Sequence, residues 1–332
     1  GRLDTGGGGL RAATGRRARI AALGGGTGLA SLLRGLKREH TDLTAIVTVA
    51  DDGGSSGRLR RELGILPPGD IRNCLVALAD DESLMGRLFQ HRFADGDLSG
   101  HPFGNLFLAA LTEVTGEFDQ AIAECSRVLK IRGRVLPSTL AHARLWAERA
   151  DGEHVCGETR IAGGPGPCRR VWLEPQPDAH PAALREIARA DLVVLGPGSL
   201  FTSVLPHLSV PDLVDSLRGT RALRVYVCNV MTQPGETDGF DAVAHVEAVL
   251  AAAPGVIDAV VVHEGALDGD AADVYARSGQ DPVRARRDRL EALGVGVVAG
   301  DVADSGSLVR HRPERLAALL MRLLRTPAAI RG

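Results

Sequence analysis

Lysine and aromatic residues are scarce in this chain of 332 residues. Its only lysines are Lys37 and Lys130, and Phe, Trp and Tyr together make up 3% of the sequence. Both lysines fall in predicted helices, so we expect no lysine-dependent chemistry. Few rings are available to stack on a base, and the loop candidates are Phe103, Phe201 and Tyr275.

An excess of charge of one sign is also missing. Lys and Arg number 39 against 41 Asp and Glu, which leaves a formal net charge of −2. The composition therefore gives no basic footprint for nucleic acid or an anionic membrane, and we expect no nucleic-acid partner. No apolar run approaches the ~20 residues needed to cross a bilayer, so we expect no membrane span.

Cysteine is sparse as well. The five cysteines are widely spaced, and no Cys-x-x-Cys pair or Cys/His cluster has the spacing of a zinc site. We therefore expect reduced thiols in a cytoplasmic protein. Residues 1–18 are rich in Gly and Arg and lack periodicity, so we expect a disordered leader there. The cysteines are Cys74, Cys125, Cys156, Cys168 and Cys228.

Hydrophobic residues make up 44% of the chain, enough for a large core. Apolar, β-branched runs alternate with segments of helical period, a pattern typical of βαβ units. We predict one α/β domain over residues 19–325, with a Rossmann-like, mainly parallel sheet and helices on both faces. The predicted strands are Arg19–Leu23, Leu43–Ala50, Asp191–Leu195, Leu223–Asn229, Val256–Val262 and Val295–Ala299. The predicted helices are Leu29–Glu39, Asp70–Ala79, Asn105–Thr115, Phe118–Ile131, Pro181–Ala190, Ala242–Ala253 and Pro313–Leu324.

The segment 135–173 has a different pattern. It contains short strand-like pieces, an Asp151-Gly152 turn and a Gly/Pro loop at Gly163–Pro167. Such pieces favour antiparallel pairing. We predict that this insert forms a small antiparallel extension in the middle of the chain.

A glycine-rich loop follows the first predicted strand. In Gly24-Gly25-Gly26-Thr27-Gly28, backbone N–H groups at a helix N-terminus can surround a phosphate, and we assign Gly25, Gly26, Thr27 and Gly28 to a ligand site. The loop is not a Walker motif, and Leu29 breaks the dinucleotide fingerprint. A turn that serves only packing is the alternative.

The second predicted strand ends in a more specific run. Acidic residues there suit a ribose hydroxyl or a metal, and the Gly/Ser stretch suits an anion beside an arginine. A solvated loop is the alternative. The site residues assigned from this run are Asp51, Asp52, Gly53, Gly54, Ser55, Ser56 and Arg58.

Four further segments carry polar residues near predicted element ends. Asp70 is expected to cap a helix, and a structural role competes with a ligand role for Asn73 and His101. At least four polar, Gly-rich loops follow predicted strands, and the carboxyl ends of parallel strands share one rim, where open α/β sheets bind ligands. The residues assigned to that rim from these segments are Asn73, His101, Asn105, Gly196, Gly198, Ser199, Thr202, Ser203 and Asn229.

Read in order, several motifs resemble the YvcK branch of the YvcK/CofD family over residues 19–325. They are GGGTG, ADDGGSSGRLR, PPGDIRN, HPFGN, ADLVVLGPGSLFTS and NVMTQPGET. The resemblance implies a gluconeogenesis factor that binds UDP-sugars such as UDP-N-acetylglucosamine and supports cell shape and peptidoglycan synthesis during gluconeogenic growth. It implies no established reaction and no required cofactor, and it adds Tyr275 and Arg310 as ligand contacts. The CofD branch implies instead a magnesium-dependent transferase that moves a phospholactyl-type group from a guanosine dinucleotide to a deazaflavin.

Three functions therefore stay open: a nucleotide-sugar-binding regulator, which we favour, a CofD-like transferase and a nicotinamide-dependent oxidoreductase. The transferase would need magnesium, for which Asp51 and Asp52 are the candidate ligands. The oxidoreductase is disfavoured because the glycine fingerprint is off register and no Ser-Tyr-x-x-x-Lys set is present. The sequence assigns no catalytic residue and leaves open a homo-oligomer and the identity of a regulatory protein partner.

Overall fold

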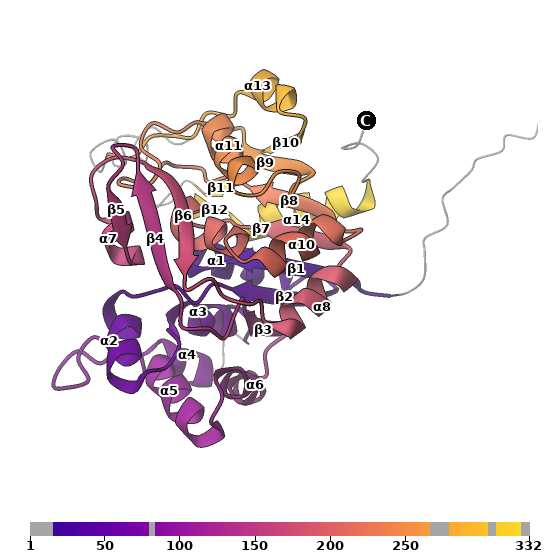
Figure 1. Ribbon diagram of the computed structural model, residues 1–332. Helices are drawn as coiled ribbons and strands as arrows, with labels where there is room; N and C mark the ends of the chain where they lie inside the picture. Colours follow the sequence, from indigo (N-terminus) through magenta and orange to yellow (C-terminus); the bar gives the residue numbers. More distant parts are fainter. Residues whose placement is uncertain (1–15, 80–83, 266–278, 305–309, 327–332) are drawn as a thin grey trace, which may run out of the picture.

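The computed structural model describes residues 16–79, 84–265, 279–304 and 310–326. Its centre is a seven-stranded parallel sheet in the order β10-β9-β8-β7-β1-β2-β3 (Figure 1). The predicted Rossmann-like, mainly parallel sheet is thus confirmed. The strands are β1 (Ala18–Gly24), β2 (Thr41–Val47), β3 (Arg134–Pro137), β7 (Leu192–Leu195), β8 (Leu223–Val227), β9 (Ala259–His263) and β10 (Gly296–Gly300).

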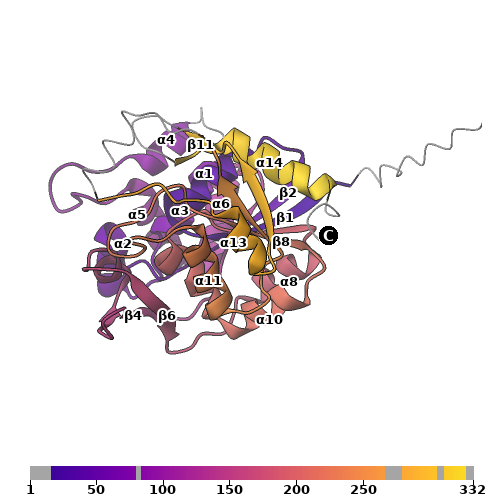
Figure 2. The ribbon, with the colours of Figure 1, turned by 90° about the horizontal axis from the view of Figure 1, so that it is seen from above.

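Helices cover both faces of this sheet, because its strands are apolar on both sides (Figure 2). Side chains alternate along β1, so Ile20 and Ala22 enter one core and Ala21 and Leu23 enter the other. The first core contains residues of α1 (Gly26–Leu36), α3 (Gly69–Leu78), α4 (Leu84–Gln90), α5 (Phe103–Thr115), α6 (Phe118–Leu129) and α14 (Pro313–Arg325). The second contains residues of α8 (Pro181–Arg189), the π-helical turn η1 (Leu200–Val204), α9 (Leu205–Leu208), α10 (Pro211–Gly219), α11 (Ala242–Ala252) and α13 (Arg287–Ala292).

The strand order reverses beside β1. The chain moves outward from β1 through β2 to β3, and then returns to the other side of β1 with β7 and moves outward again to β10. The carboxyl ends of β1 and β7 therefore lie at the strand-order reversal, the usual ligand position in open α/β folds. The candidate site is therefore expected at the carboxyl ends of these strands.

The predicted antiparallel extension is present but begins later than expected. Its strands β4 (Arg144–Arg149), β5 (His154–Cys156) and β6 (Cys168–Glu174) pair in the order β5-β4-β6. The prediction was wrong for 135–137: β3 pairs parallel with β2, since Val135 is buried in the first core. The Asp151-Gly152 turn joins β4 to β5, with Gly152 at a φ of +89°.

Two local predictions near α2 (Gly54–Leu63) differ from the structure. Gly54, Ser55 and Ser56 form the first turn of this helix rather than a loop, which the Gly/Ser composition concealed. Asp70 does not cap α3, because that helix begins at Gly69 and makes no side-chain cap bond. The Asp70 side chain is instead buried below the first glycine loop.

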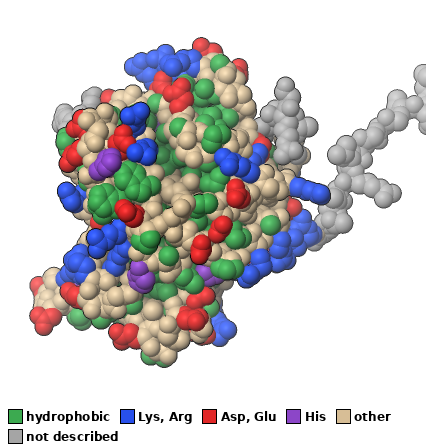
Figure 3. All heavy atoms as spheres, viewed as in Figure 1, with side chains coloured by type: hydrophobic (Ala, Val, Ile, Leu, Met, Phe, Trp, Pro, Cys, Tyr) green, Lys and Arg blue, Asp and Glu red, His purple; other side chains and the backbone are tan. Residues whose placement is uncertain are grey.

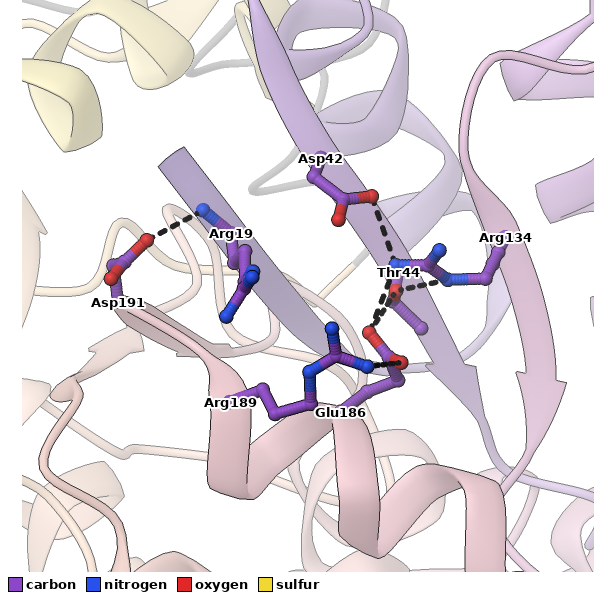
Figure 4. Close-up of polar contacts among 7 residues, drawn as sticks. All are labelled: Arg19, Asp42, Thr44, Arg134, Glu186, Arg189 and Asp191. Atoms are coloured by element: carbon purple, nitrogen blue, oxygen red, sulfur yellow. Dashed lines mark hydrogen bonds and ion pairs between the residues drawn. The ribbon is translucent and has the colours of Figure 1, made fainter. Parts of the chain in front are cut away.

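Ion pairs connect residues at the amino ends of the strands (Figure 4). Arg134 on β3 lies 2.9 Å from both Asp42 on β2 and Glu186 on α8. On the other half of the sheet, Arg224 pairs with Asp258 at 2.6 Å. Among the described residues, no helix is long and apolar enough to cross a membrane.

Candidate functional site

A cleft of about 380 Å³ lies at the carboxyl ends of β1, β7 and β8, where the strand order reverses. Loops from four parts of the chain meet there. It is lined by Gly25, Gly26, Thr27, Gly28, Ser31, Glu158, Pro197, Gly198, Ser199, Ser203, Asn229, Val230, Met231, Thr232, Gln233, Gln280, Arg310 and His311.

The first glycine loop forms the wall below α1. Helix α1 begins at Gly26, whose φ is +61°, and its N-cap residue Gly25 has no side chain to bond the free N–H groups. The buried Asp70 carboxylate accepts from the Gly26 backbone N–H. A Cβ at Gly28 would lie 2.6 Å from the Pro197 carbonyl oxygen, and one at Gly25 would lie 2.5 Å from the Asp70 carboxylate. Glycine is therefore required for the loops after β1 and β7 to approach, and the remaining N–H groups of the first turn of α1 suit an anion in the cleft.

Amide and hydroxyl groups connect the loops after β7 and β8. Gln233 donates from Nε2 to Ser199 Oγ at 2.7 Å, and Asn229 donates from Nδ2 to Gln233 Oε1 at 3.1 Å. The Gln233 backbone N–H donates to Thr237 Oγ1 at 2.8 Å, which holds the second loop in place. These bonds fix three polar side chains of the lining in defined orientations.

Arg310 reaches the cleft from the C-terminal part of the chain. It lies on β12 (Arg310–His311), which pairs with β11 (Ala303–Asp304). The buried ring of His311 donates from Nε2 to the Cys228 carbonyl at 3.1 Å, and burial lowers its pKa to about 4. His311 is thus a neutral anchor that holds Arg310, an exposed residue, at the edge of the cleft.

Acidic side chains gather around the cleft: Glu158 belongs to its lining, whereas Asp70 lies below the first glycine loop and Glu236 lies behind the lining. Burial, together with the charges of Asp70 and Asp51, raises the pKa of Glu158 to about 9. Burial likewise raises the pKa of Glu236 to about 7 and that of Asp70 to about 6. Among the described residues, Glu158 and Glu236 each have one buried oxygen with no hydrogen-bond partner. Each of these two carboxyl groups can therefore accept one more hydrogen bond, or donate one where the acid is protonated.

The antiparallel extension positions Glu158, which is on α7 (Glu158–Ala162). Arg149 on β4 is fully buried, with 1% of its surface exposed, and its guanidinium donates to five backbone carbonyls. Two of these belong to Arg160 and Ile161 on α7, and another belongs to Gly235 in the loop after β8. One arginine thus ties α7 to the rim of the main sheet.

Fewer than half of the residues assigned from the sequence line the cleft. The described lining contains nine of them: Gly25, Gly26, Thr27, Gly28, Gly198, Ser199, Ser203, Asn229 and Arg310. Tyr275 lies outside the described residues. Thr202 is buried behind the lining, where its Oγ1 donates to Glu236 at 3.3 Å, and Gly196 turns the chain after β7 with a φ of +79°.

The residues around α2 form a separate polar cluster rather than part of the lining. Ser55 Oγ lies 2.8 Å from His101 Nδ1 and accepts from Asn105 Nδ2 at 3.0 Å, in a buried network. Ser56 accepts from the Gly69 backbone at 3.1 Å. Ser55, Ser56, His101 and Asn105 are therefore all held by partners within the protein. Gly53 is the N-cap residue of α2, and Gly54 is the first residue of that helix.

Three other assigned side chains have partners away from the lining. Arg58 donates to the Ser99 carbonyl at 2.7 Å, and Asn73 accepts from Arg72 at 2.6 Å. Asp52 accepts from the backbone and hydroxyl of Thr159 at 2.9 and 3.0 Å. Each is therefore held by the protein itself.

Asp51 and Asp52, the candidate magnesium ligands of the transferase alternative, both accept hydrogen bonds within the protein. Within the described ranges, no three His, Cys, Asp or Glu side chains are placed to hold a metal ion. Asp52 accepts from Thr159 through Oδ1, and Asp51 accepts from the Gly53 N–H through Oδ1 at 2.8 Å. Each carboxylate is thus oriented through one oxygen, and one or two carboxylates with substrate phosphates can suffice for magnesium.

Sequence reasoning missed two functional candidates of different kinds. Gln233 lies within the quoted NVMTQPGET motif, so its position after β8 was available as a signal. Glu158 carried no such signal, because it reaches the cleft only through the fold of the extension.

The model of the family 2-phospho-L-lactate transferase CofD matches residues 20–303. The chain belongs to the CofD family. Within that family it is similar to proteins named gluconeogenesis factor. The Bacillus subtilis protein of that name is 47% identical and aligns over 94% of this chain and 99% of its own length. A Nostoc protein named putative gluconeogenesis factor is 49% identical over 92% of this chain and 69% of its own.

A solved structure agrees with these family relationships. A crystal structure of a UPF0052 family member from Bacillus halodurans superposes with a TM-score of 0.90 at 45% identity. It covers 92% of this chain and all of that chain. The fold described above is therefore shared by a close CofD family relative.

Proposed function

We propose that the protein is a cytoplasmic, nucleotide-sugar-binding regulator, with UDP-N-acetylglucosamine as the representative ligand. On this proposal it acts, as a gluconeogenesis factor, in maintaining cell shape and peptidoglycan synthesis during gluconeogenic growth. The observation that carries the proposal is the cleft at the strand-order reversal, with N–H groups of the first turn of α1 on one wall and Arg310 at its edge.

The two walls suit the two halves of such a ligand. N–H groups and a guanidinium favour a pyrophosphate, and arginine can bind phosphate oxygens in bidentate fashion. The opposite wall offers Glu158 and the ordered amides of Asn229 and Gln233, which suit sugar and ribose hydroxyls. A volume of about 380 Å³ lies within the range of small-molecule sites.

The test is calorimetric titration with UDP-N-acetylglucosamine. Arg310→Gln should weaken binding by about ten-fold or more, since a charge-assisted hydrogen bond contributes roughly 1.5–3 kcal/mol. Arg312→Gln is the matched control, because this exposed neighbour does not line the cleft. Tyr275→Ala should also weaken binding if this tyrosine contacts the base.

Unchanged affinity in Arg310→Gln would show that the C-terminal part of the cleft is not used. A thermal-shift comparison settles the ligand class: at equal concentration NAD, ATP and phosphate should shift the melting temperature much less than the UDP-sugar does. A shift with NAD alone would favour the oxidoreductase reading and overturn the proposal.

A CofD-like transferase is the second candidate, and the match to the family model of that name favours it. If the protein is a binding regulator, magnesium, a deazaflavin acceptor and the guanosine-linked donor should give no product at a useful rate. Product at many turnovers, lost in Asp51→Asn, would establish the transferase instead.

A further inference from the structure

A second hollow, separate from the cleft, lies between α2 and the antiparallel extension. Its volume is about 640 Å³, and its lining shares no residue with that of the cleft. Helix α7 runs between the two: Glu158 lines the cleft, whereas Arg160 lines this hollow. The second hollow is therefore a distinct place for a ligand.

The hollow is lined by cationic side chains from three elements. Arg60 and Arg61 come from α2, Arg144 from the start of β4, and Arg160 from α7. His142 adds a further nitrogen-bearing ring. Figure 3 shows Lys and Arg side chains gathered on this side of the molecule, around α2 and below the extension.

The charges of these arginines are only partly balanced, since Asp52 and Asp51 act on Arg60 without a close ion pair among the described residues. In the described part of the chain, none of the four forms an ion pair, in contrast to Arg134 and Arg224 at the other rim. Asp52 is the acidic residue of the lining, and Thr159 already occupies one of its oxygens.

Mutual repulsion follows from this grouping. Burial lowers the pKa of Arg60, and the neighbouring charge of Arg144 lowers it further. Arg60 is held in place by a bond to the Ala143 carbonyl at 2.7 Å, so it cannot simply turn into solvent. Like charges held close together are unfavourable unless an anion joins them.

We propose that this hollow binds the polyphosphate group of a small molecule. Planar guanidinium groups bind phosphate oxygens in pairs, and several converging on one point favour more than one phosphate. A concave site of this volume fits a small molecule, whereas an extended acidic peptide would need a longer groove. The site does not depend on the nucleotide-sugar proposal, since it uses none of the cleft residues.

The experiment is a calorimetric titration of the full chain with pyrophosphate at about 0.15 M salt, where non-specific pairing is screened. The double variant Arg61→Gln/Arg144→Gln removes two exposed arginines of the hollow. We expect it to weaken pyrophosphate binding at least ten-fold. Arg132→Gln/Arg221→Gln is the control, because it removes the same charge from exposed positions elsewhere. A melting curve for each variant checks folding, and Arg160→Gln provides a second route to the same result.

Arg310→Gln separates this hollow from the cleft. Pyrophosphate binding that survives Arg310→Gln but not Arg61→Gln/Arg144→Gln supports the proposal. The reverse pattern, equal losses in the control, or no binding by the wild type overturns it. Binding of hexaglutamate without binding of pyrophosphate would also overturn it, in favour of an acidic peptide.

Discussion

At the amino ends of the parallel strands, arginines and carboxylates meet in pairs: Arg134 joins β2, β3 and α8, and Arg224 joins Asp258. At the carboxyl ends, the half-buried Glu158 and the buried Glu236 lie beside other acids, with one buried oxygen each left unpartnered among the described residues. The two rims belong to one sheet and share its strands. We infer from their difference that the amino rim stabilises the sheet, whereas the carboxyl rim leaves polar groups available to the proposed ligand.

The proposed role of the carboxyl rim can be tested by a substitution that separates the loops after β1 and β7. Gly28→Ala should destabilise the protein by about 3 kcal/mol, because the new methyl group meets the backbone of Pro197 and Gly198 at less than 3.0 Å. Backbone atoms cannot move aside as a flexible side chain can, so the loops after β1 and β7 must separate. UDP-N-acetylglucosamine binding should be lost with them.

Chemical denaturation measures this effect, and Gly219→Ala is its control. Gly219 is at the end of α10, and a Cβ there would meet nothing within 4 Å. A stability for Gly28→Ala equal to that of Gly219→Ala would show that the close approach of the loops is not required.

The fold was predictable because its information is local and periodic. The alternation of Ile20 to Leu23 and the glycine loop after it specify a buried parallel strand and the turn that follows. The segment 135–137 was assigned to the insert because its pairing with β2 joins segments far apart in the sequence.

The site was predictable to the extent that it follows strand ends. Gly25, Ser199 and Asn229 each lie just after a strand, and all three line the cleft. Glu158 reaches the cleft because the buried Arg149 ties α7 to Gly235, a contact that spans 86 residues. No local pattern encodes such a contact.

The raised pKa of Glu158 should make the stability of the protein depend on pH. The pKa of Glu158 is raised to about 9, so the folded state holds a proton that the unfolded state releases. Stability from this proton is complete below the unfolded pKa of roughly 4.3 and is lost as the pH rises through about 9. Glu158→Gln removes the titration and should stabilise the protein by about 2 kcal/mol at pH ~8.

Denaturation at several pH values measures the difference between the wild type and Glu158→Gln, which should grow from pH ~5 to ~8. Glu113→Gln, an exposed substitution on α5, should leave the pH profile unchanged. A constant difference between wild type and Glu158→Gln would contradict the buried, proton-holding carboxyl.

The smallest effect belongs to the amino rim, where the charges are paired but partly exposed. Arg134→Ala removes contacts with Asp42 and Glu186 at 2.9 Å, yet 47% of the Arg134 side chain is exposed. Water and salt screen such pairs, so the loss should be about 1 kcal/mol or less and should shrink at high salt. Denaturation at low and high salt measures it, with the exposed Arg132→Ala as control. Because this rim lies at the opposite end of the strands from the cleft, UDP-sugar affinity should not change. Weaker ligand binding in Arg134→Ala alone would mean that the two rims are coupled through β2 and β3, and the division between a stabilising and a binding rim would fail.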